Sequence, residues 1–416
     1  MLVVGNAVST LGNAVYLVAV LLLLKELTES AFVMGLFQFV AIAPGFFLSP
    51  VTGTLVDRMS RRTVIIVADL FRGLVMIVAS GLLLLPATRG AIVVLVAATC
   101  IGIGNAFFVP AVQALIPSLV PPSKLPWANG VRAGGTQLFN LAGNAAGGLL
   151  YALLGAPLLF LINGASFVLS ALQESFIRTD ASARGAAAAG APATRVAAPH
   201  AAATAVATGT VDRSAGGVRE QAREGLRVVA GAPRLRRAIV SQAGLFVLSP
   251  VLLLSLPFIV IDELGLPQAT LGYVFAAALA GGILAFVVLG RRGRPDRTGA
   301  RIPRIGYAIT SLALAGLAVS STLPLVVAAA VVVGAASAAV YLHAITMIQR
   351  EYDRAIHGRL FAILEAVTSL VGPISFVVTG VLLDLLGPDR RAVLFAIAAA
   401  AAAVWALAMW IADRPG

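Results

Sequence analysis

Gly53-Thr54-Leu55-Val56-Asp57-Arg58-Met59-Ser60-Arg61-Arg62 places one aspartate and three arginines between two long apolar runs. The runs, residues 30–52 and 63–86, are nearly uncharged, and each is longer than the about 20 residues that an α-helix needs to cross a bilayer. The sequence therefore predicts a tight loop between two membrane helices. Because arginines resist transfer across a membrane, we expect this loop to stay on the cytoplasmic side.

The composition of the whole chain agrees with a membrane protein. Of 416 residues, 59% are hydrophobic and 12% are charged, whereas soluble domains are roughly half apolar and about a quarter charged. The net charge of +12 comes from basic residues between the apolar runs, which indicates topology signals and contact with anionic lipids and not nucleic acid. Cys100 is the only cysteine, so no intrachain disulfide or thiolate metal cluster is expected, and we expect neither metal nor cofactor.

The apolar runs predict an all-α polytopic membrane protein with about twelve helices in two halves of six. A linker rich in alanine, at residues 179–235, separates residues 1–178 from residues 236–416, and its segment 218–229 has the pattern of a short amphipathic helix. The first run lacks the basic start and cleavage site of a secretory signal, so we expect it to be retained. The predicted spans are 2–24, 30–52, 63–86, 91–116, one from 127, then 157–177, 238–261, 269–290, 302–320, 323–346, 357–383 and 391–412.

The spacing Gly-x-x-x-Asp-Arg-x-Ser-Arg-Arg resembles the loop between the second and third helices of the major facilitator superfamily, in which glycine stands in the place of Ser60. The resemblance implies a twelve-helix transporter in which this loop is a latch that holds helix ends together in one state. The alternative is a topology signal alone. The latch residues would be Gly53, Asp57, Arg58, Arg61 and Arg62, with Asp296 and Arg297 as their repeat in the second half.

The second half also repeats a glycine pattern of the first. Gly380-x-Leu-x-x-Leu-Leu-Gly387 matches Gly148-x-Leu-x-x-Leu-Leu-Gly155. Many secondary transporters are built from repeated halves, with the substrate site near the midplane between them. The arginines gather in alternate loops, which predicts a multi-pass protein of the cytoplasmic (inner) cell membrane with both termini in the cytoplasm.

Polar residues form stripes in several spans. Asn6, Ser9, Thr10 and Asn13 lie on one helical face of the first span. Such a face lines either a cavity or a helix interface, because polar groups are costly in lipid. The predicted cavity residues are Asn6, Asn13, Gln38, Gln113, Arg132, Gln137, Asn140, Gln242 and Tyr341.

Ionisable residues inside spans are candidates for proton coupling. Glu365 stands alone in the eleventh span, with no basic residue within four positions, and a carboxyl removed from water holds a proton more readily than an exposed one. Asp69 and Arg72 lie three apart on one helical face, so they can pair within the third span. In each case a structural role is the alternative: a hydrogen-bonded glutamate, or a pair at the cytoplasmic edge. His343 is more simply explained as a packed residue.

Gly143-Asn144-Ala-Ala-Gly147-Gly148 resembles the Gly-Pro-x-x-Gly-Gly motif of superfamily exporters, with Asn144 in the place of proline, and we expect it and Gly372-Pro373 to serve helix packing. Together with Phe160-x-x-Asn163-x-x-Ser166-Phe167, it resembles the branch of macrolide and enterobactin exporters. The resemblance implies a monomeric secondary exporter of lipophilic or amphiphilic compounds, driven by proton antiport and able to confer multidrug resistance. An importer or narrow metabolite carrier of the same fold remains an alternative, and a scaffold is a third. Enzyme motifs such as Gly-x-Ser-x-Gly and His-Glu-x-x-His are absent from the chain.

Overall fold

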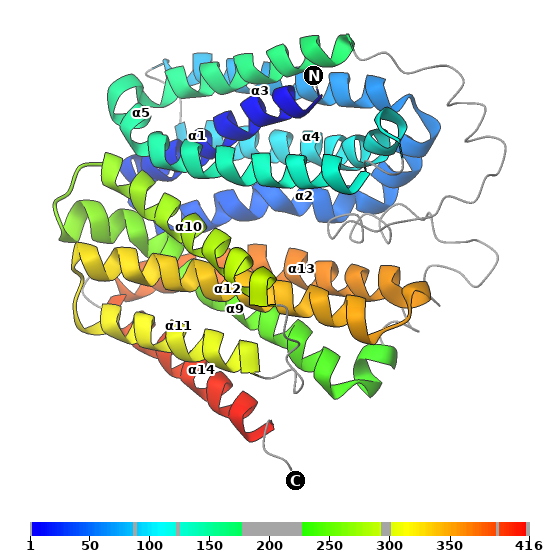
Figure 1. Cartoon of the computed structure of the whole chain (residues 1–416). Helices are drawn as coiled ribbons and strands as arrows, with labels where there is room; N and C mark the ends of the chain where they lie inside the picture. The colour runs from blue at the N-terminus through cyan, green and yellow to red at the C-terminus, as the bar shows by residue number, and fades with distance from the viewer. Residues whose placement is uncertain are drawn as a thin grey trace.

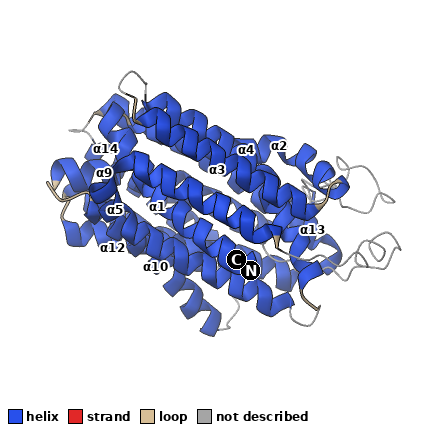
Figure 2. Cartoon of the chain, turned by 90° about the horizontal axis from the view of Figure 1, so that it is seen from above, coloured by secondary structure: helices blue, strands red, loops and turns tan. Residues whose placement is uncertain are grey.

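The computed structural model describes residues 2–85, 90–121, 125–176, 227–292, 301–387 and 391–412. These residues form helices and their connections, with no strand among them (Figure 2). The helices are α1 (Leu2–Thr28), α2 (Ala31–Arg58), α3 (Arg61–Leu83), α4 (Gly90–Leu119), α5 (Leu125–Ser175), α9 (Pro233–Phe258), α10 (Ala269–Arg292), α11 (Arg301–Val319), α12 (Leu323–Glu351), α13 (Arg354–Leu386) and α14 (Arg391–Ala412). A short π-helix, Ile259–Glu263, continues α9.

The helices are long enough to give twelve membrane crossings. Eleven helical segments of the described ranges are sufficiently long and apolar to span a membrane. One of them, within α5, is 42 residues long and is interrupted at Gly155, whose φ of 72° breaks the helix, so it makes two crossings. Gly387 at the end of α13 has the same φ of 72°, and only glycine adopts this conformation without strain. The predicted all-α polytopic fold is confirmed, and the glycine repeat corresponds to two equivalent helix ends.

The charged stretch 53–62 is less of a loop than the sequence predicted. The helix α2 continues through Gly53 and Asp57 to Arg58, and α3 begins at Arg61, so only Met59 and Ser60 lie between the two helices. Ser60 occupies the position before the first turn of α3, where serine is a favoured residue. The charges therefore sit on helix ends.

The two halves lie one above the other in Figure 1, with α1–α5 in the upper bundle and α9–α14 in the lower one. They meet mainly through two helix pairs, α2 with α13 and α5 with α10. The two pairs are equivalent under the repeat, because in each pair the second helix of one half packs on the fifth helix of the other half. Secondary transporters that are built from two repeated halves share this arrangement, in which the halves meet at one interface.

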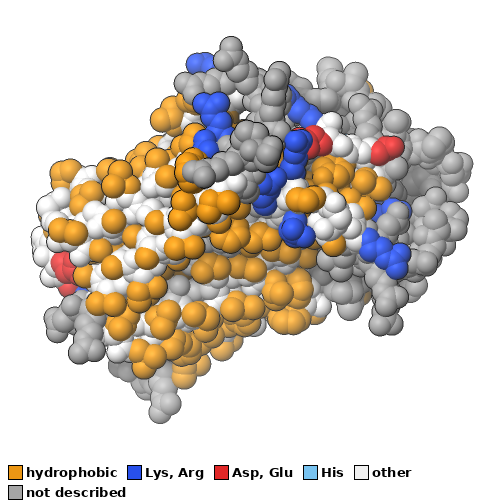
Figure 3. Space-filling model, turned by 90° about the horizontal axis from the view of Figure 1, so that it is seen from below, with side chains coloured by type: hydrophobic (Ala, Val, Ile, Leu, Met, Phe, Trp, Pro, Cys, Tyr) orange, Lys and Arg blue, Asp and Glu red, His pale blue; other side chains and the backbone are white. Residues whose placement is uncertain are grey.

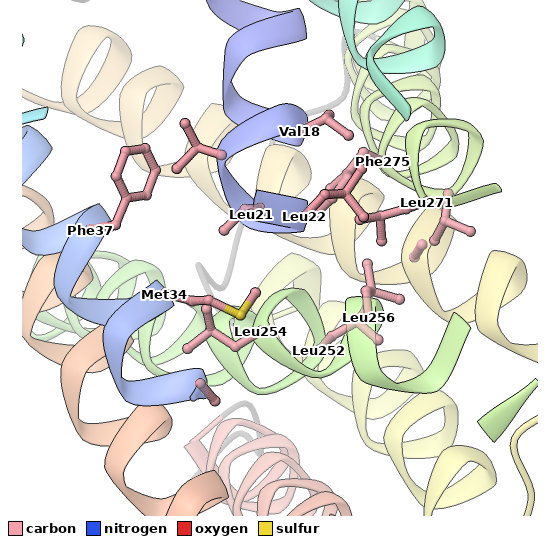
Figure 4. Packing of buried hydrophobic residues seen from close by; sticks show 14 of the residues in the cluster. Val18, Leu21, Leu22, Met34, Phe37, Leu252, Leu254, Leu256, Leu271 and Phe275 are labelled. Atoms are coloured by element: carbon pink, nitrogen blue, oxygen red, sulfur yellow. The ribbon is translucent and has the colours of Figure 1, made fainter. Parts of the chain in front are cut away.

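The contact between the halves is concentrated at one end of the molecule. We call it the clasp end: it is the end at which α1 leads into α2 and α9 leads into α10. There Met34 of α2 lies next to Leu254 of α9, and Val18 and Leu22 of α1 face Phe275 and Leu271 of α10 (Figure 4). Except for Phe275, which is 8% exposed, these side chains are at most 1% exposed. Apolar packing therefore joins the two halves at this end.

Glycines allow the backbones of the two halves to touch. A Cβ atom at Gly380 of α13 would lie 2.5 Å from the carbonyl oxygen of Ala31 in α2, and one at Gly148 of α5 would lie 2.5 Å from that of Gln268. Gly35 and Gly272 make the reciprocal close approaches, to Phe376 and Asn144. Small residues at helix crossings permit such proximity in membrane proteins.

Replacing Gly380 with alanine is expected to loosen the clasp end. The added methyl group would overlap the backbone of α2, and overpacking of this kind costs about 1–3 kcal/mol. In a variant with Cys100→Ala and Met34→Cys, Gly380→Ala should raise the rate at which a water-soluble maleimide labels Cys at position 34 by about fivefold or more. Gly45→Ala is the matched control, because nothing lies within 4 Å of its added carbon. Equal labelling rates in the two variants would contradict the expectation.

The surface of the bundle suits a lipid environment. Large hydrophobic side chains such as Leu153, Leu312, Val319 and Val404 are at least 66% exposed. Figure 3 shows hydrophobic side chains over much of one face, with Lys and Arg gathered toward the right-hand part.

We call the end of the molecule opposite the clasp end the basic end. It is the end at which α2 leads into α3 and α12 leads into α13, and it carries Arg61, Arg62, Arg350 and Arg359.

Candidate functional site

Asp384 of α13 joins the two halves at the clasp end. Its carboxylate accepts hydrogen bonds from the Ser30 hydroxyl at 2.5 Å and from the backbone N–H groups of Ala31 and Phe32 at 2.7 and 3.1 Å. These donors form the start of α2, where the first backbone N–H groups have no partner within the helix and the helix dipole favours a negative charge. The first turn of α2 is therefore completed by a residue of the other half.

Two more side-chain contacts cross between the halves nearby, and a third supports one of them within the first half. Lys25 of α1 forms an ion pair with Asp262 at 2.6 Å. The Gln268 amide donates to Glu26 at 2.6 Å, and the Tyr151 hydroxyl, in the same half as Glu26, donates to its other carboxylate oxygen at 2.6 Å. We define the clasp as Lys25, Glu26, Ser30, Asp262, Gln268 and Asp384. A pocket lined in part by Glu29, Asp262, Asp384 and Arg391 opens beside it.

Asp69 and Arg72 of α3 form a buried ion pair inside the first half. Asp69 is 0% and Arg72 is 2% exposed. Arg72 also donates to the side-chain oxygen of Asn105 in α4 at 2.7 Å. Its guanidinium carbon lies 3.9 Å and 4.6 Å from the ring centroids of Phe108 and Phe167, which is within the range of a cation–π contact. The pair is thus enclosed by α4 and α5 and does not lie at a solvent-exposed edge.

Glu174, near the end of α5, belongs to the same group of charges. It is 3% exposed and is close enough to Asp69, Arg72 and Ser170 to interact with them electrostatically. Glu174 is not among the residues predicted from the sequence, although it lies inside the predicted sixth span, 157–177. The available signal was its spacing: Glu174 follows Ser170 by four residues and so shares its helical face. We define the Arg72 cluster as Asp69, Arg72, Asn105, Ser170 and Glu174.

Glu365 lies in the other half and has a different environment. It is half-buried in α13, and its carboxylate accepts a hydrogen bond from the Tyr341 hydroxyl of α12 at 3.0 Å. Among the residues that the structure describes, no lysine or arginine forms an ion pair with it. The structure therefore brings together two predicted residues, Tyr341 and Glu365, and separates both from the Arg72 cluster.

The other predicted cavity residues are spread over both halves. Asn13 of α1 accepts a hydrogen bond at 3.3 Å from Asn163 of α5, so part of the first stripe joins helices within one half. Gln242 of α9 is buried, and its side-chain oxygen has no partner. Gln38, Gln113, Gln137 and Asn140 are half-buried. The side chains of Asn6 and Arg132 lie outside the described part of the structure.

Two latch residues make contacts at the basic end. Arg61 donates to the backbone carbonyl of Ala114 in α4 at 2.9 Å. Arg62 donates to the carbonyls of Glu174 and Ser175 at the end of α5, where a cation also suits the helix dipole. Gly53, Asp57 and Arg58 are helical, but their side chains are not described, and Asp296 and Arg297 lie outside the described residues.

The exporter-like motif of α5 faces two neighbours. A Cβ atom at Gly143 would lie 2.6 Å from Ala14, and one at Gly147 would lie 2.8 Å from Val18, both in α1. Asn144 is buried, and Gly148 meets the other half as described above. In α13, Gly372 packs against Phe246 and Pro373 lies inside the helix. The motif therefore lies where α5 contacts both α1 and α10.

The remaining candidates lie elsewhere in the bundle. His343 is buried in α12 and Cys100 is half-buried in α4. Of the predicted amphipathic helix, only residues from 227 onward are described; Val228 and Val229 pack against the core of the second half. In the described ranges no group of three His, Cys, Asp or Glu side chains is arranged to hold a metal ion.

Comparison with known proteins agrees with this architecture. The model of the Major Facilitator Superfamily matches residues 2–319 and 251–416. The chain is 28% identical over 177 residues to macrolide efflux protein A of Streptococcus pyogenes, which covers 42% of this chain and 43% of that protein. It is 31% identical over 176 residues to the uncharacterised transporter YjbB of Bacillus subtilis, covering 40% and 42%. The aligned stretch thus spans less than half the length of each relative.

Solved structures share the whole fold at low identity. The nucleoside transporter NupG superposes with a TM-score of 0.73 at 12% identity, covering 100% of this chain and 98% of that one. A bacterial homologue of ferroportin in an inward-facing state gives a TM-score of 0.69 at 18% identity, with the same coverage. The fold and the interface between the halves together define a polytopic helical membrane protein built from two repeated halves. The chain belongs to the Major Facilitator Superfamily and is a membrane transporter.

Proposed function

We propose that the protein exports lipophilic or amphiphilic small molecules by alternating access, in exchange for protons. The observation that carries this proposal is Glu365, a half-buried carboxyl whose partner is the neutral hydroxyl of Tyr341 at 3.0 Å. A carboxyl without a fixed cation can gain or lose a proton without breaking an ion pair. It is therefore better suited to coupling than Asp69, which is held by Arg72.

The orientation follows from the placement of arginine. The basic end carries Arg61, Arg62, Arg350 and Arg359, and such residues stay in the cytoplasm. The clasp end then faces outward, and both termini are cytoplasmic. We infer that the closed clasp belongs to a state that opens to the cytoplasm, the state from which an exporter takes up its substrate. A protein of similar fold, the ferroportin homologue, was solved in an inward-facing state.

Similarity to a relative supports the direction and the substrate class. Macrolide efflux protein A, as its name states, exports macrolides. The predicted cavity residues whose side chains the structure describes are amides and a tyrosine. Arg132 is the one charged residue in the predicted set. Neutral hydrogen-bonding groups beside apolar surface are typical of sites for drug-sized ligands.

One proton provides enough free energy for this work. A proton moving through 100 mV releases about 2.3 kcal/mol, and each pH unit adds about 1.36 kcal/mol. Since a tenfold gradient requires about 1.4 kcal/mol, one proton can support a tenfold or larger gradient of a neutral substrate.

Glu365→Gln is expected to abolish export that depends on the proton gradient. The amide keeps the size and the hydrogen bond to Tyr341 but cannot exchange a proton. The measurement is efflux of a lipophilic cationic dye and of a macrolide from cells that express the native chain or the variant, with and without an uncoupler. Native efflux should stop when uncoupler is added, and the variant should match cells that lack the protein.

Glu351→Gln is the matched control, because Glu351 is an exposed glutamate at the end of α12. It should export like the native chain. If Glu365→Gln is correctly inserted and exports normally, Glu365 has a structural role and the proposal of coupling through it is wrong. Uptake in place of efflux would instead identify an importer of the same fold. If neither compound is transported, a metabolite carrier of narrow specificity becomes the favoured function.

A further inference from the structure

The Arg72 cluster contains more carboxyl groups than cations. Two carboxyl groups, Asp69 and Glu174, lie next to one guanidinium group, that of Arg72. If both carboxyls were ionised, the cluster would carry a net charge of −1 in a site where both are at most 3% exposed. An uncompensated buried charge is strongly unfavourable.

The unused atoms show where a donor is missing. Oδ2 of Asp69, Oε2 of Glu174 and the Ser170 hydroxyl oxygen are all buried and have no hydrogen-bond partner, and the two carboxyl groups are close enough to interact electrostatically. Two ionised carboxylates cannot bond, because each only accepts. The Ser170 hydroxyl can donate to only one of these oxygens, and a single proton on either carboxyl would create a second O–H donor between them.

We propose that Asp69 and Glu174 bind one proton between them, so that the cluster is a proton site separate from Glu365. With this proton in place, Arg72 balances the one remaining negative charge. The proton belongs to the pair of carboxyls and not to either residue, as expected for strongly interacting acids.

Every element packed around the pair contributes to this balance. On α3 the charged groups are Arg72 and, two turns before Asp69, Arg62, whose side chain donates to the carbonyls of Glu174 and Ser175. On α4 the facing polar group is Asn105, which takes a hydrogen bond from Arg72, and on α5 it is Ser170. The side chains of Asp57 and Arg58 at the end of α2 are not described. Among the described residues, Arg72 is thus the cation that contacts the carboxyl pair.

The site lies near the basic end and next to the latch. Arg62 binds the backbone of Glu174 itself, so loss of the proton would place repulsion between α3 and α5 at the point where the latch stretch is attached. The binding of the proton does not depend on proton-driven export. Only its use in transport rests on the proposed function, so the two can fail separately.

Infrared spectroscopy of the purified protein tests the proposal directly. A protonated carboxyl has a carbonyl stretch that an ionised carboxylate lacks. We expect the native protein at neutral pH to show this band, and Glu174→Gln and Asp69→Asn each to remove the same component, because the two residues share one proton. Glu351→Gln should leave the band unchanged.

Glu365→Gln separates the two candidate sites. A band that persists in Glu174→Gln but disappears in Glu365→Gln would assign the proton to Glu365 and overturn the proposal. The proposal would also be overturned if the native protein showed no such band. Loss of the band when sodium is added would overturn it as well, because the site would then bind sodium. Glu174→Gln is the variant of choice for folding, since its amide can donate to Asp69 and restore the missing bond. If Glu174→Gln melts at the same temperature as the native protein, its spectrum can be compared directly with the native spectrum.

Discussion

Arg72→Met is expected to prevent the protein from accumulating in a folded form. Methionine fills similar space but leaves Asp69 and Glu174 buried without their cation, and breaking a buried ion pair costs about 3–5 kcal/mol. The contacts of the guanidinium with Phe108 and Phe167, at 3.9 and 4.6 Å, are lost as well. Because natural proteins are stable by only about 5–15 kcal/mol, the loss should appear as a low yield of monodisperse protein in detergent and a much lower melting temperature.

Two further variants give this prediction its control. Arg291→Met removes an exposed arginine at the end of α10 and should leave the yield and melting temperature unchanged. Asp69→Asn combined with Arg72→Met removes a negative charge together with the positive one, so it should recover part of the stability lost in Arg72→Met. A single variant that melts like the native protein would show that Arg72 does not stabilise the fold.

The sequence was sufficient to predict the spans and the repeat. Each span is a local property: a run of apolar residues must be a helix in lipid, because the backbone has no other way to satisfy its hydrogen bonds. The glycines at 155 and 387 predicted a repeat, and both have the same positive φ of 72° in the structure. The charged stretch 53–62 was predicted less well, because helix α2 keeps its hydrogen bonds after it leaves the apolar run and ends only at Arg58.

The clasp could not be predicted from the sequence. Ser30 and Asp384 are 354 positions apart, and Lys25 and Asp262 are 237 apart. Each looks like an ordinary polar residue at the end of a span, and only the packing of the halves brings the partners together. The same reason applies to Glu174, whose proximity to Asp69 depends on how α5 packs against α3.

Asp384→Ala is expected to shift the molecule toward states in which the clasp is open. The variant leaves the Ser30 hydroxyl and the N–H groups of Ala31 and Phe32 without their acceptor. Hydrogen bonds to a charged group contribute about 1.5–3 kcal/mol, and Asp384 is exposed, so we take the lower end of that range for the set. This corresponds to about a tenfold change in the ratio of closed to open molecules.

Spin labels across the clasp measure this ratio. Because Cys100 is the only cysteine, Cys100→Ala with Leu27→Cys and Leu385→Cys gives one exposed label on each half. Asp384→Ala should increase the population with long distances between the labels. Asp353→Asn, at the basic end, should leave the distribution unchanged. An unchanged distribution in Asp384→Ala would mean that the apolar contact of Met34 with Leu254 holds the halves together without the carboxylate. The clasp would then be a consequence of closure and not its cause.

The same variant should also change the rate of export. In an exporter the open form releases substrate, so a shift in population without loss of folding alters how often the outward-facing state is reached.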